Sequence, residues 1–118
     1  MFFNRKPIID KDIISKILEY SNKYRVIDTE QFKIRFSENK FKDNLDVSFR
    51  DVKTNLSIDM IFDKEGQMTD IKTYERYKDN KIKISSNKIN SILSNVFNDV
   101  TLSSENIRNE IKTSQLKI

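Results

Sequence analysis

The clearest pattern in this chain is an alternation of apolar and polar positions that begins at residue 32. Phe32, Ile34 and Phe36 alternate with Lys33 and Arg35, and a period of two is typical of a strand with one buried face. This predicts a strand over residues 32–36 and a turn over 37–40. The same alternation predicts further strands over 41–50, 56–62 and about 67–77, then a turn over 78–81 and inward-facing Ile82 and Ile84.

The best-defined hairpin in the sequence joins the strand that starts at Leu56 to the strand that starts at Gln67. Its connection reads Asp63-Lys64-Glu65-Gly66 and contains the only glycine of the chain. Asp suits the first position of a type I turn, and Gly adopts a positive φ without steric cost. We therefore expect a tight hairpin with Gly66 at its tip.

Helical spacing of apolar residues flanks the predicted strands on both sides. Residues 11–24 are predicted to form a first helix, with Asp10 as its cap and a hydrophobic staple between Ile9 and Ile14. The strongest helical pattern follows Ser85-Ser86 and ends at Asn98-Asp99. A third, shorter helix is predicted after Ser103 or Ser104, on the spacing of Ile107, Ile111 and Leu116.

The order of these elements predicts one α+β domain over residues 1–118. We expect an N-terminal helix, an antiparallel four- or five-stranded meander, then one long and one shorter C-terminal helix, because the links between strands are short. One face of the sheet should pack on the helices, and antiparallel sheets allow the other face to meet water.

The amino-acid composition excludes several kinds of catalytic and metal-binding site. The chain has no His and no Cys, which excludes His-based triads, thiol nucleophiles and thiolate zinc sites. One glycine is too few for a Gly-rich phosphate loop. No apolar run is long enough for a signal sequence or a membrane span, so we expect a cytoplasmic protein. The Ile-, Lys- and Asn-rich composition suggests an AT-rich genome, such as that of a low-GC bacterium, its phage or a plasmid.

The charge of the chain indicates a possible binding surface only when it is mapped onto the predicted strands. The net charge is +4, and no single segment carries it. The alternation nevertheless places basic residues on the outward face of the sheet, opposed there by Asp46, Asp59 and Asp70. Such a face would attract phosphates or an acidic partner, or would only keep the sheet solvated. Its predicted nucleic-acid or acidic-partner binding residues are Lys33, Arg35, Lys72, Tyr74, Arg76, Lys81 and Lys83, and Arg50 shares the face.

One arrangement of carboxylates resembles the core of metal-dependent nucleases. If Phe62 pairs with Gln67, Asp59 lies roughly opposite Asp70, and Lys72 shares their face. Two carboxylates there would hold Mg²⁺. The Asp/Glu-x-Lys pattern recurs by chance in this Lys-rich chain, however, for example at Glu38, Asp51, Asp79 and Glu110.

Three functions follow from these observations. The first is a small non-enzymatic protein-interaction module, such as a regulator, inhibitor or accessory factor of a phage, plasmid or other mobile element, with a protein as its partner. The second is a nucleic-acid-binding protein that uses the basic sheet face. The third is a divalent-metal nuclease built on Asp59, Asp70 and Lys72. The first two imply no cofactor, no metal and no catalytic residue.

Overall fold

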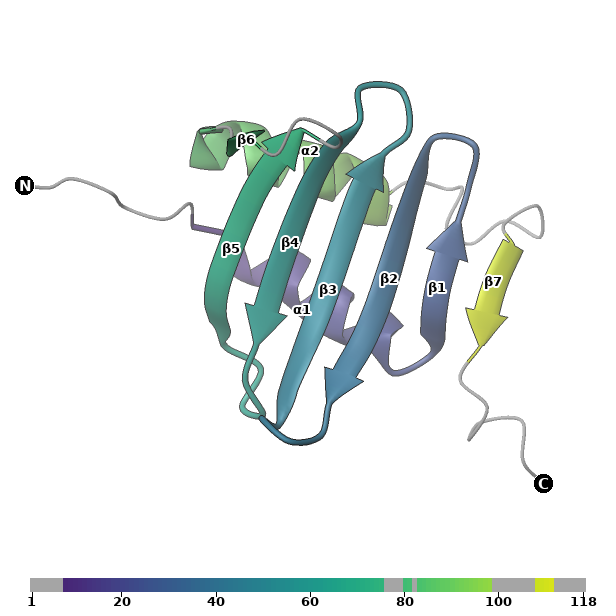
Figure 1. The fold of residues 1–118 in the computed structure, drawn as a ribbon, viewed down its shortest axis with the longest axis vertical. Helices are drawn as coiled ribbons and strands as arrows, with labels where there is room; N and C mark the ends of the chain where they lie inside the picture. The colour runs from purple at the N-terminus through teal and green to yellow at the C-terminus, as the bar shows by residue number, and fades with distance from the viewer. Residues whose placement is uncertain (1–7, 76–79, 82, 99–107, 112–118) are drawn as a thin grey trace, which may run out of the picture.

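The protein folds as one antiparallel sheet with two helices packed on one of its faces (Figure 1). The structure is a computed structural model, and it describes residues 8–75, 80–81, 83–98 and 108–111. The strands run in the order β6-β5-β4-β3-β2-β1-β7, so each pairs with its neighbour in the chain except β7. The predicted α+β class and the predicted meander are confirmed for the five central strands.

Four of the five central strands follow the alternation in the sequence, with most apolar residues toward the helices and the residues between them toward the other face. The first strand departs from it at an irregularity between Tyr24 and Val26. Short links keep consecutive strands adjacent and antiparallel. The strands are β1 Tyr24–Asp28, β2 Phe32–Asn39, β3 Asn44–Asp51, β4 Leu56–Phe62 and β5 Met68–Glu75.

The turn between β2 and β3 lies later than predicted. It occupies residues 40–43, not 37–40, so Ser37, Glu38 and Asn39 belong to β2. The side chain of Asn39 accepts the N–H groups of Phe41 and Lys42, at 3.1 and 3.3 Å, and Asp43 adopts a φ of 58°. Asn and Asp tolerate such turn geometry because their short side chains bond to the local backbone. The hydrophobic pattern could not show this, because Phe41 lies exposed at the tip.

The hairpin between β4 and β5 has the predicted geometry. Gly66 adopts a φ of 82° and its N–H donates to the Asp63 carbonyl at 2.9 Å. The Asp63 carboxylate also accepts the N–H groups of Glu65 and Gln67. A Cβ on Gly66 would lie 3.0 Å from Cδ1 of Leu18, so the glycine also lets the first helix approach this turn.

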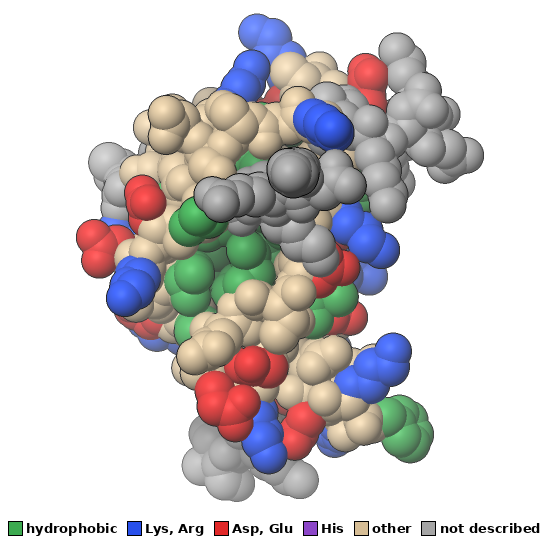
Figure 2. Space-filling view, turned by 90° about the vertical axis from the view of Figure 1, so that its left-hand side faces the viewer, with side chains coloured by type: hydrophobic (Ala, Val, Ile, Leu, Met, Phe, Trp, Pro, Cys, Tyr) green, Lys and Arg blue, Asp and Glu red, His purple; other side chains and the backbone are tan. Residues whose placement is uncertain are grey.

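Among the described residues, another strand pairs with the outer side of β5 at Tyr74 and Glu75. The short strand β6 Asn80–Lys81 pairs with Tyr74 and Glu75 alone. The residues of β6 were predicted to lie in a turn, and their pairing with β5 corrects that prediction. Figure 2 looks onto this side of the molecule and shows hydrophobic side chains at the bottom of a hollow between polar rims.

The first helix, α1 Lys11–Ser21, is shorter than predicted. Tyr24 starts β1 and does not end the helix, because the β-branched Val26 and Ile27 favour a strand immediately afterwards. The ring of Tyr24 still stacks on Tyr20 with centroids 6.0 Å apart, which accounts for their helical spacing. Asp10 occupies the N-cap position without a capping bond from its side chain.

The second helix, α2 Ser86–Asn98, begins and ends where the sequence predicts. The hydroxyl of Ser85 accepts the Lys88 N–H at 3.2 Å, a typical N-cap bond. Hydrogen bonds also hold the start of the described chain to this helix. Ile8 donates its N–H to the Ser86 hydroxyl, and Asn90 bonds to both the Ile8 carbonyl and the Asp10 N–H.

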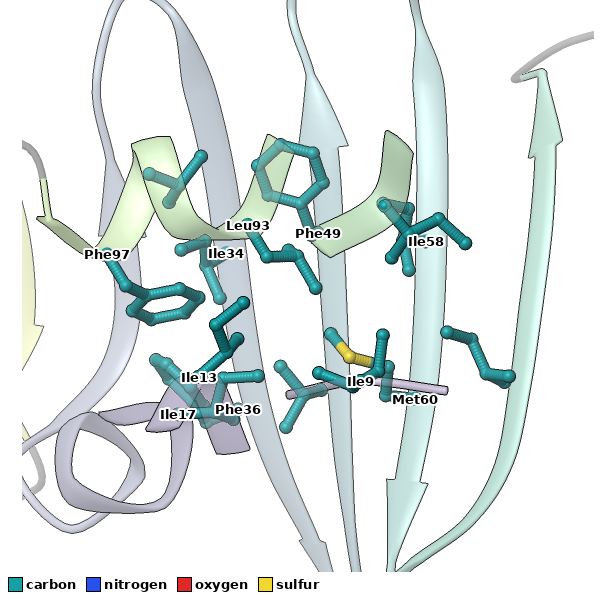
Figure 3. Packing of buried hydrophobic residues seen from close by; sticks show 14 of the residues in the cluster. Ile9, Ile13, Ile17, Ile34, Phe36, Phe49, Ile58, Met60, Leu93 and Phe97 are labelled. Carbon is teal, nitrogen blue, oxygen red and sulfur yellow. The ribbon is translucent and has the colours of Figure 1, made fainter. Parts of the chain in front are cut away.

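The core lies between the helices and the covered face of the sheet (Figure 3). Ile17 from α1 and Leu93 from α2 are fully buried, as are Phe49, Ile58 and Met60 from the strands. Burial of an aliphatic or aromatic side chain of this size contributes about 1.5–3 kcal/mol. The helices therefore cover the face that the alternation marks as apolar.

The predicted shorter C-terminal helix is wrong where the structure describes it. Arg108–Ile111 form strand β7, which pairs with β1. A spacing of four residues, as between Ile107 and Ile111, fits one face of a strand as well as one face of a helix, so a short apolar stripe did not discriminate between the two. The remainder of that predicted helix lies outside the described residues.

Candidate functional site

The open face of the sheet carries a shallow hollow of about 640 Å³ that spans β1 to β5. The pleat directs every second side chain of each strand toward it. The residues around it are three cations, three residues with hydroxyl groups, one carboxylate and two aliphatic residues, and of these Ile34 has its side chain in the core and Ser57 is buried. We call it the open-face hollow, and its residues are Val26, Asp28, Lys33, Ile34, Arg35, Ser48, Arg50, Ser57 and Tyr74.

Two cations face each other across neighbouring strands in this hollow. The register of β2 and β3 places Lys33 directly opposite Arg50, and like charges in that position are destabilising. On the other side of β2, Asp28 lies opposite Lys33 and its carboxylate is 3.9 Å from the Lys33 Nζ. Only the lysine of this pair is therefore close to a carboxylate.

Neither arginine of the hollow has an acidic neighbour across the strands. Arg35 lies between Val26 and Ser48, and Arg50 lies between Lys33 and Ser57. In the part of the chain that the structure describes, no carboxylate is within ion-pair distance of Arg35 or Arg50. Both guanidinium groups thus keep their charge and their five N–H donors for another molecule.

A hydrogen-bonded chain of side chains occupies the β3–β5 side of the hollow. Asp59 accepts the Ser48 hydroxyl at 2.8 Å and the Tyr74 hydroxyl at 2.9 Å. Burial, and then the bond to the Asp59 carboxylate, raise the pKa of Tyr74 above its usual value, while a bond from Ser57 opposes the rise. Tyr74 is consequently a neutral donor, and Asp59 is engaged by hydroxyl groups and not by either arginine.

The chemistry of the hollow suits an anionic group. Guanidinium and ammonium groups bind carboxylates and phosphates through charge-assisted hydrogen bonds, and arginine does so with two parallel bonds. The Ser48 hydroxyl, which donates its hydrogen to Asp59, can still accept a hydrogen bond beside them. The hollow therefore presents cations that can bind a carboxylate or phosphate, with polar groups beside them.

The structure brings together some of the predicted site residues. Lys33, Arg35 and Tyr74 line the hollow, and Lys72 lies on the same face beside Asp59. Lys83 follows β6, is exposed and belongs to no strand. Lys81 pairs with Tyr74, but its side chain is not described, and Arg76 lies outside the described residues.

Sequence reasoning missed the hydroxyl groups and Asp28. Ser48 and Ser57 stand at outward positions of predicted strands, so alternation alone could have placed them on this face. Their link to Asp59 and Tyr74 depends on the register of three strands. Asp28 was missed because residues 25–30 were expected to be a connector or a short extended piece, whereas Tyr24–Asp28 form a strand of the sheet between β2 and β7.

The pairing on which the nuclease hypothesis depended is not formed. Asp59 lies opposite Lys72, and Asp70 lies opposite Ile61. The register differs because Phe62 pairs with Met68 and not with Gln67, with an irregularity between Ile61 and Phe62. Within residues 8–75, 80–81, 83–98 and 108–111, no three acidic side chains come together as a metal site.

Comparisons with known proteins give no family for this chain. A scan against models of protein families found no match, and searches of curated proteins and of solved structures found none either. Neither α1 nor α2, the helices of the described chain, is long and apolar enough to cross a lipid bilayer. The function must therefore be argued from the geometry of the hollow.

Proposed function

We propose that this chain is a small, non-enzymatic protein-interaction module whose open-face hollow binds carboxylate groups of a partner protein. The observation that carries this proposal is the placement of Lys33 directly opposite Arg50, with no acid opposite either Arg50 or Arg35. Such a placement costs stability in the free protein. An anionic partner would relieve the repulsion between the two cations, so binding would recover the free energy that this placement costs the folded protein.

The balance of charge on the whole open face favours a protein partner over a long polyanion. Its described side chains include as many acids as bases, and only the hollow has an excess of cations. A nucleic-acid backbone, with one charge about every 1.7 Å of duplex, needs a continuous basic track. Localised carboxylates on a protein surface need only a local one. The bases are Lys33, Arg35, Arg50 and Lys72, and the acids are Asp28, Asp46, Asp59 and Asp70.

The hydroxyl chain supports recognition of a carboxylate that has hydrogen-bonding neighbours. Asp59 and Tyr74 hold Ser48 in place at one side of the hollow. Fixed groups lose less conformational entropy when a partner binds. A peptide with Asp or Glu residues, whose amide N–H groups can donate to these hydroxyl oxygens, fits this combination of charge and polarity.

Nucleic-acid binding is the second candidate, because the Tyr74 side chain lines the hollow beside the cations. Aromatic rings next to basic residues are the usual platform for unpaired bases. The Tyr74 hydroxyl is engaged by Asp59, which keeps the ring in a defined position. This alternative predicts preference for single-stranded nucleic acid and a steep dependence of affinity on salt.

The test is a titration of the isotopically labelled full chain, followed by NMR, with two probes. One probe is a short poly-glutamate peptide and the other is single-stranded oligothymidylate. We expect the peptide to shift the amides of Arg35, Ser48, Arg50 and Ser57. Arg35→Gln and Arg50→Gln should each weaken binding about tenfold, the effect of removing one charged hydrogen bond. The exposed Lys53, in the β3–β4 loop, gives the matched control Lys53→Gln.

The outcomes separate the two candidates. Tighter binding of oligothymidylate, with affinity that falls steeply as salt rises, would replace the protein-binding proposal with the nucleic-acid one. If neither probe shifts the hollow, or if Lys53→Gln weakens binding as much as Arg50→Gln, the hollow is not an anion site and the proposal fails.

A further inference from the structure

The three cations of the open-face hollow form a triangle on two neighbouring strands, and we call Lys33, Arg35 and Arg50 the cation triangle. Lys33 and Arg50 face each other across β2 and β3, so their Cβ atoms are roughly 5 Å apart. Arg35 is two residues from Lys33 along β2, a step of about 7 Å. It lies diagonally from Arg50, at roughly 7–8 Å. Long side chains at these positions can reach one point above the sheet, so all three charges are available to a single group.

Two acids that flank the cation triangle are engaged by groups other than its arginines. The Asp28 carboxylate is 3.9 Å from the Lys33 Nζ. The Asp59 carboxylate accepts the hydroxyls of Ser48 and Tyr74, at 2.8 and 2.9 Å. In the described part of the chain, no carboxylate lies within ion-pair distance of either arginine. The two guanidinium groups therefore remain available to an anion from another molecule.

A phosphorylated side chain matches the cation triangle better than a carboxylate does. A carboxylate has one charge and two oxygens, so a single guanidinium fork occupies both oxygens. A phosphate monoester carries a charge of about −1.5 to −2 at neutral pH and has three acceptor oxygens. Two guanidinium forks and an ammonium group can therefore donate to it together, whereas a carboxylate leaves part of the cluster without a counter-charge.

We propose that phosphorylation of the partner protein regulates its binding to this site. A phosphorylated side chain within an acidic segment lies between Lys33, Arg35 and Arg50, and a carboxylate in the same place binds more weakly. This inference rests on the proposed function, because it takes the hollow as an anion site for a protein partner. It adds that the partner carries a phosphate monoester, and that removal of the phosphate weakens the complex.

The first test measures the binding of three peptides to the full chain by isothermal titration calorimetry. They are glutamate peptides that differ at the central position, which holds phosphoserine, glutamate or serine. The phosphoserine peptide should bind about tenfold more tightly than the glutamate one, the effect of one further charge-assisted hydrogen bond. Inorganic phosphate supplies the same chemistry without a peptide and should bind far more weakly than the phosphopeptide. Equal affinity for the free ion would contradict the role of a phosphorylated partner.

The second test removes the guanidinium fork and keeps the charge. Arg35→Lys and Arg50→Lys should each bring the preference for phosphoserine over glutamate close to one, because a lysine donates as a point charge and not as a planar fork. Arg25→Lys makes the same substitution at an exposed position of β1 outside the hollow and should leave the preference unchanged. A preference that survives both changes in the hollow would place the phosphate elsewhere and would overturn the proposal.

The pH dependence of binding gives a direct third test, because the chain has no histidine. Histidine is the side chain that ordinarily titrates between about pH 5 and 8, whereas the second ionisation of a phosphate monoester has a pKa of about 6. Binding of the phosphopeptide should therefore strengthen up to about fourfold from about pH 5.5 to about 7.5, as the dianion replaces the monoanion. Binding of the glutamate peptide should change much less over the same range.

The outcomes separate this inference from the proposed function. If the phosphoserine and glutamate peptides bind equally, and both bind more weakly to Arg50→Gln than to the unmodified chain, the hollow is a carboxylate site and only the inference about phosphate fails. If no peptide binds, the proposed function fails as well. A flat pH profile for the phosphopeptide would contradict recognition of the dianion. Tighter binding of single-stranded oligothymidylate than of the phosphopeptide would assign the hollow to nucleic acid and would overturn both.

Discussion

The two faces of this sheet are made by the same strands and have opposite physical roles. In β3, Val47 and Phe49 lie against the helices and are almost fully buried, whereas Asp46 and Ser48 between them are exposed. One strand thus contributes to both faces at alternate positions. The covered face is stabilised by burial of apolar area, and the open face by pairs of side chains across the strands.

The difference in packing explains why we propose the open face, and not the covered face, as the binding site. A residue of the covered face must match the volume of its neighbours, because interiors are densely packed. The open face tolerates charges that stability alone would not select, as the facing Lys33 and Arg50 show. The helices therefore supply the stability that lets the other face of the sheet keep two arginines without acidic neighbours.

The strongest test of this comparison uses two adjacent residues of β3. Phe49→Ala should lower the free energy of unfolding by about 3–5 kcal/mol, because it removes a buried ring and leaves a cavity. Ser48→Ala, on the open face, removes one hydrogen bond to Asp59 and should cost about 1 kcal/mol. Urea unfolding of both variants measures the difference. Similar losses of unfolding free energy in the two variants would show that the covered face does not contribute more to stability than the open face.

A smaller effect is expected from the hydroxyl chain of the open face. Tyr74→Phe removes the bond to Asp59 and should lower the free energy of unfolding by about 1 kcal/mol at neutral pH. The pKa of Tyr74 is raised in the folded protein. Its contribution is therefore complete below the pKa of a tyrosine in the unfolded chain, and it is lost as the pH rises through the folded value.

The same variant tests the sign of this pH dependence. Tyr74→Phe should lose less stability than the unmodified protein when the pH is raised through the range in which tyrosine ionises. Tyr20, whose pKa burial also raises, remains in both proteins and acts as an internal reference. Thermal unfolding at several alkaline pH values measures the difference, and parallel losses in both proteins would contradict the role given to Tyr74.

The smallest expected effect has the opposite sign. Arg50→Gln removes the repulsion with Lys33 and should raise the free energy of unfolding by about 0.2–1 kcal/mol at low salt. Added salt should reduce the gain, because it screens charges at the surface. Lys53→Gln, with no cation opposite it in the described strands, is the matched comparison. A loss of stability in Arg50→Gln would show that the arginine is held by its aliphatic stem and not opposed by Lys33.

Much of the fold could be predicted from local patterns. Alternation of apolar residues located the strands that begin at Phe32 and Leu56, and the turn at Gly66 has the expected φ. Predictions were less accurate where a residue fits two patterns. Tyr24 continues the helical spacing of α1 yet starts a strand, and Arg108–Ile111, which lie in the predicted third helix, form β7.

The candidate site was predicted in composition but not in arrangement. Alternation places Lys33, Arg35, Lys72 and Tyr74 on one face, as the structure has them. Which of them meet depends on register, and a shift of two residues placed Lys72 opposite Asp59 in place of Asp70. Register is set by turn geometry and by irregularities such as the one after Ile61, which no periodicity reveals.

The sequence by itself determined which side of each strand is apolar, because that depends only on the order of residues and the two-residue period of the pleat. It also determined the absence of histidine and cysteine chemistry. The tertiary structure decided which outward side chains became neighbours. The convergence of Lys33, Arg35 and Arg50 beside the hydroxyl chain arises from the pairing of strands. Pairing is a long-range property, because residues far apart in the chain must meet before either can influence the other.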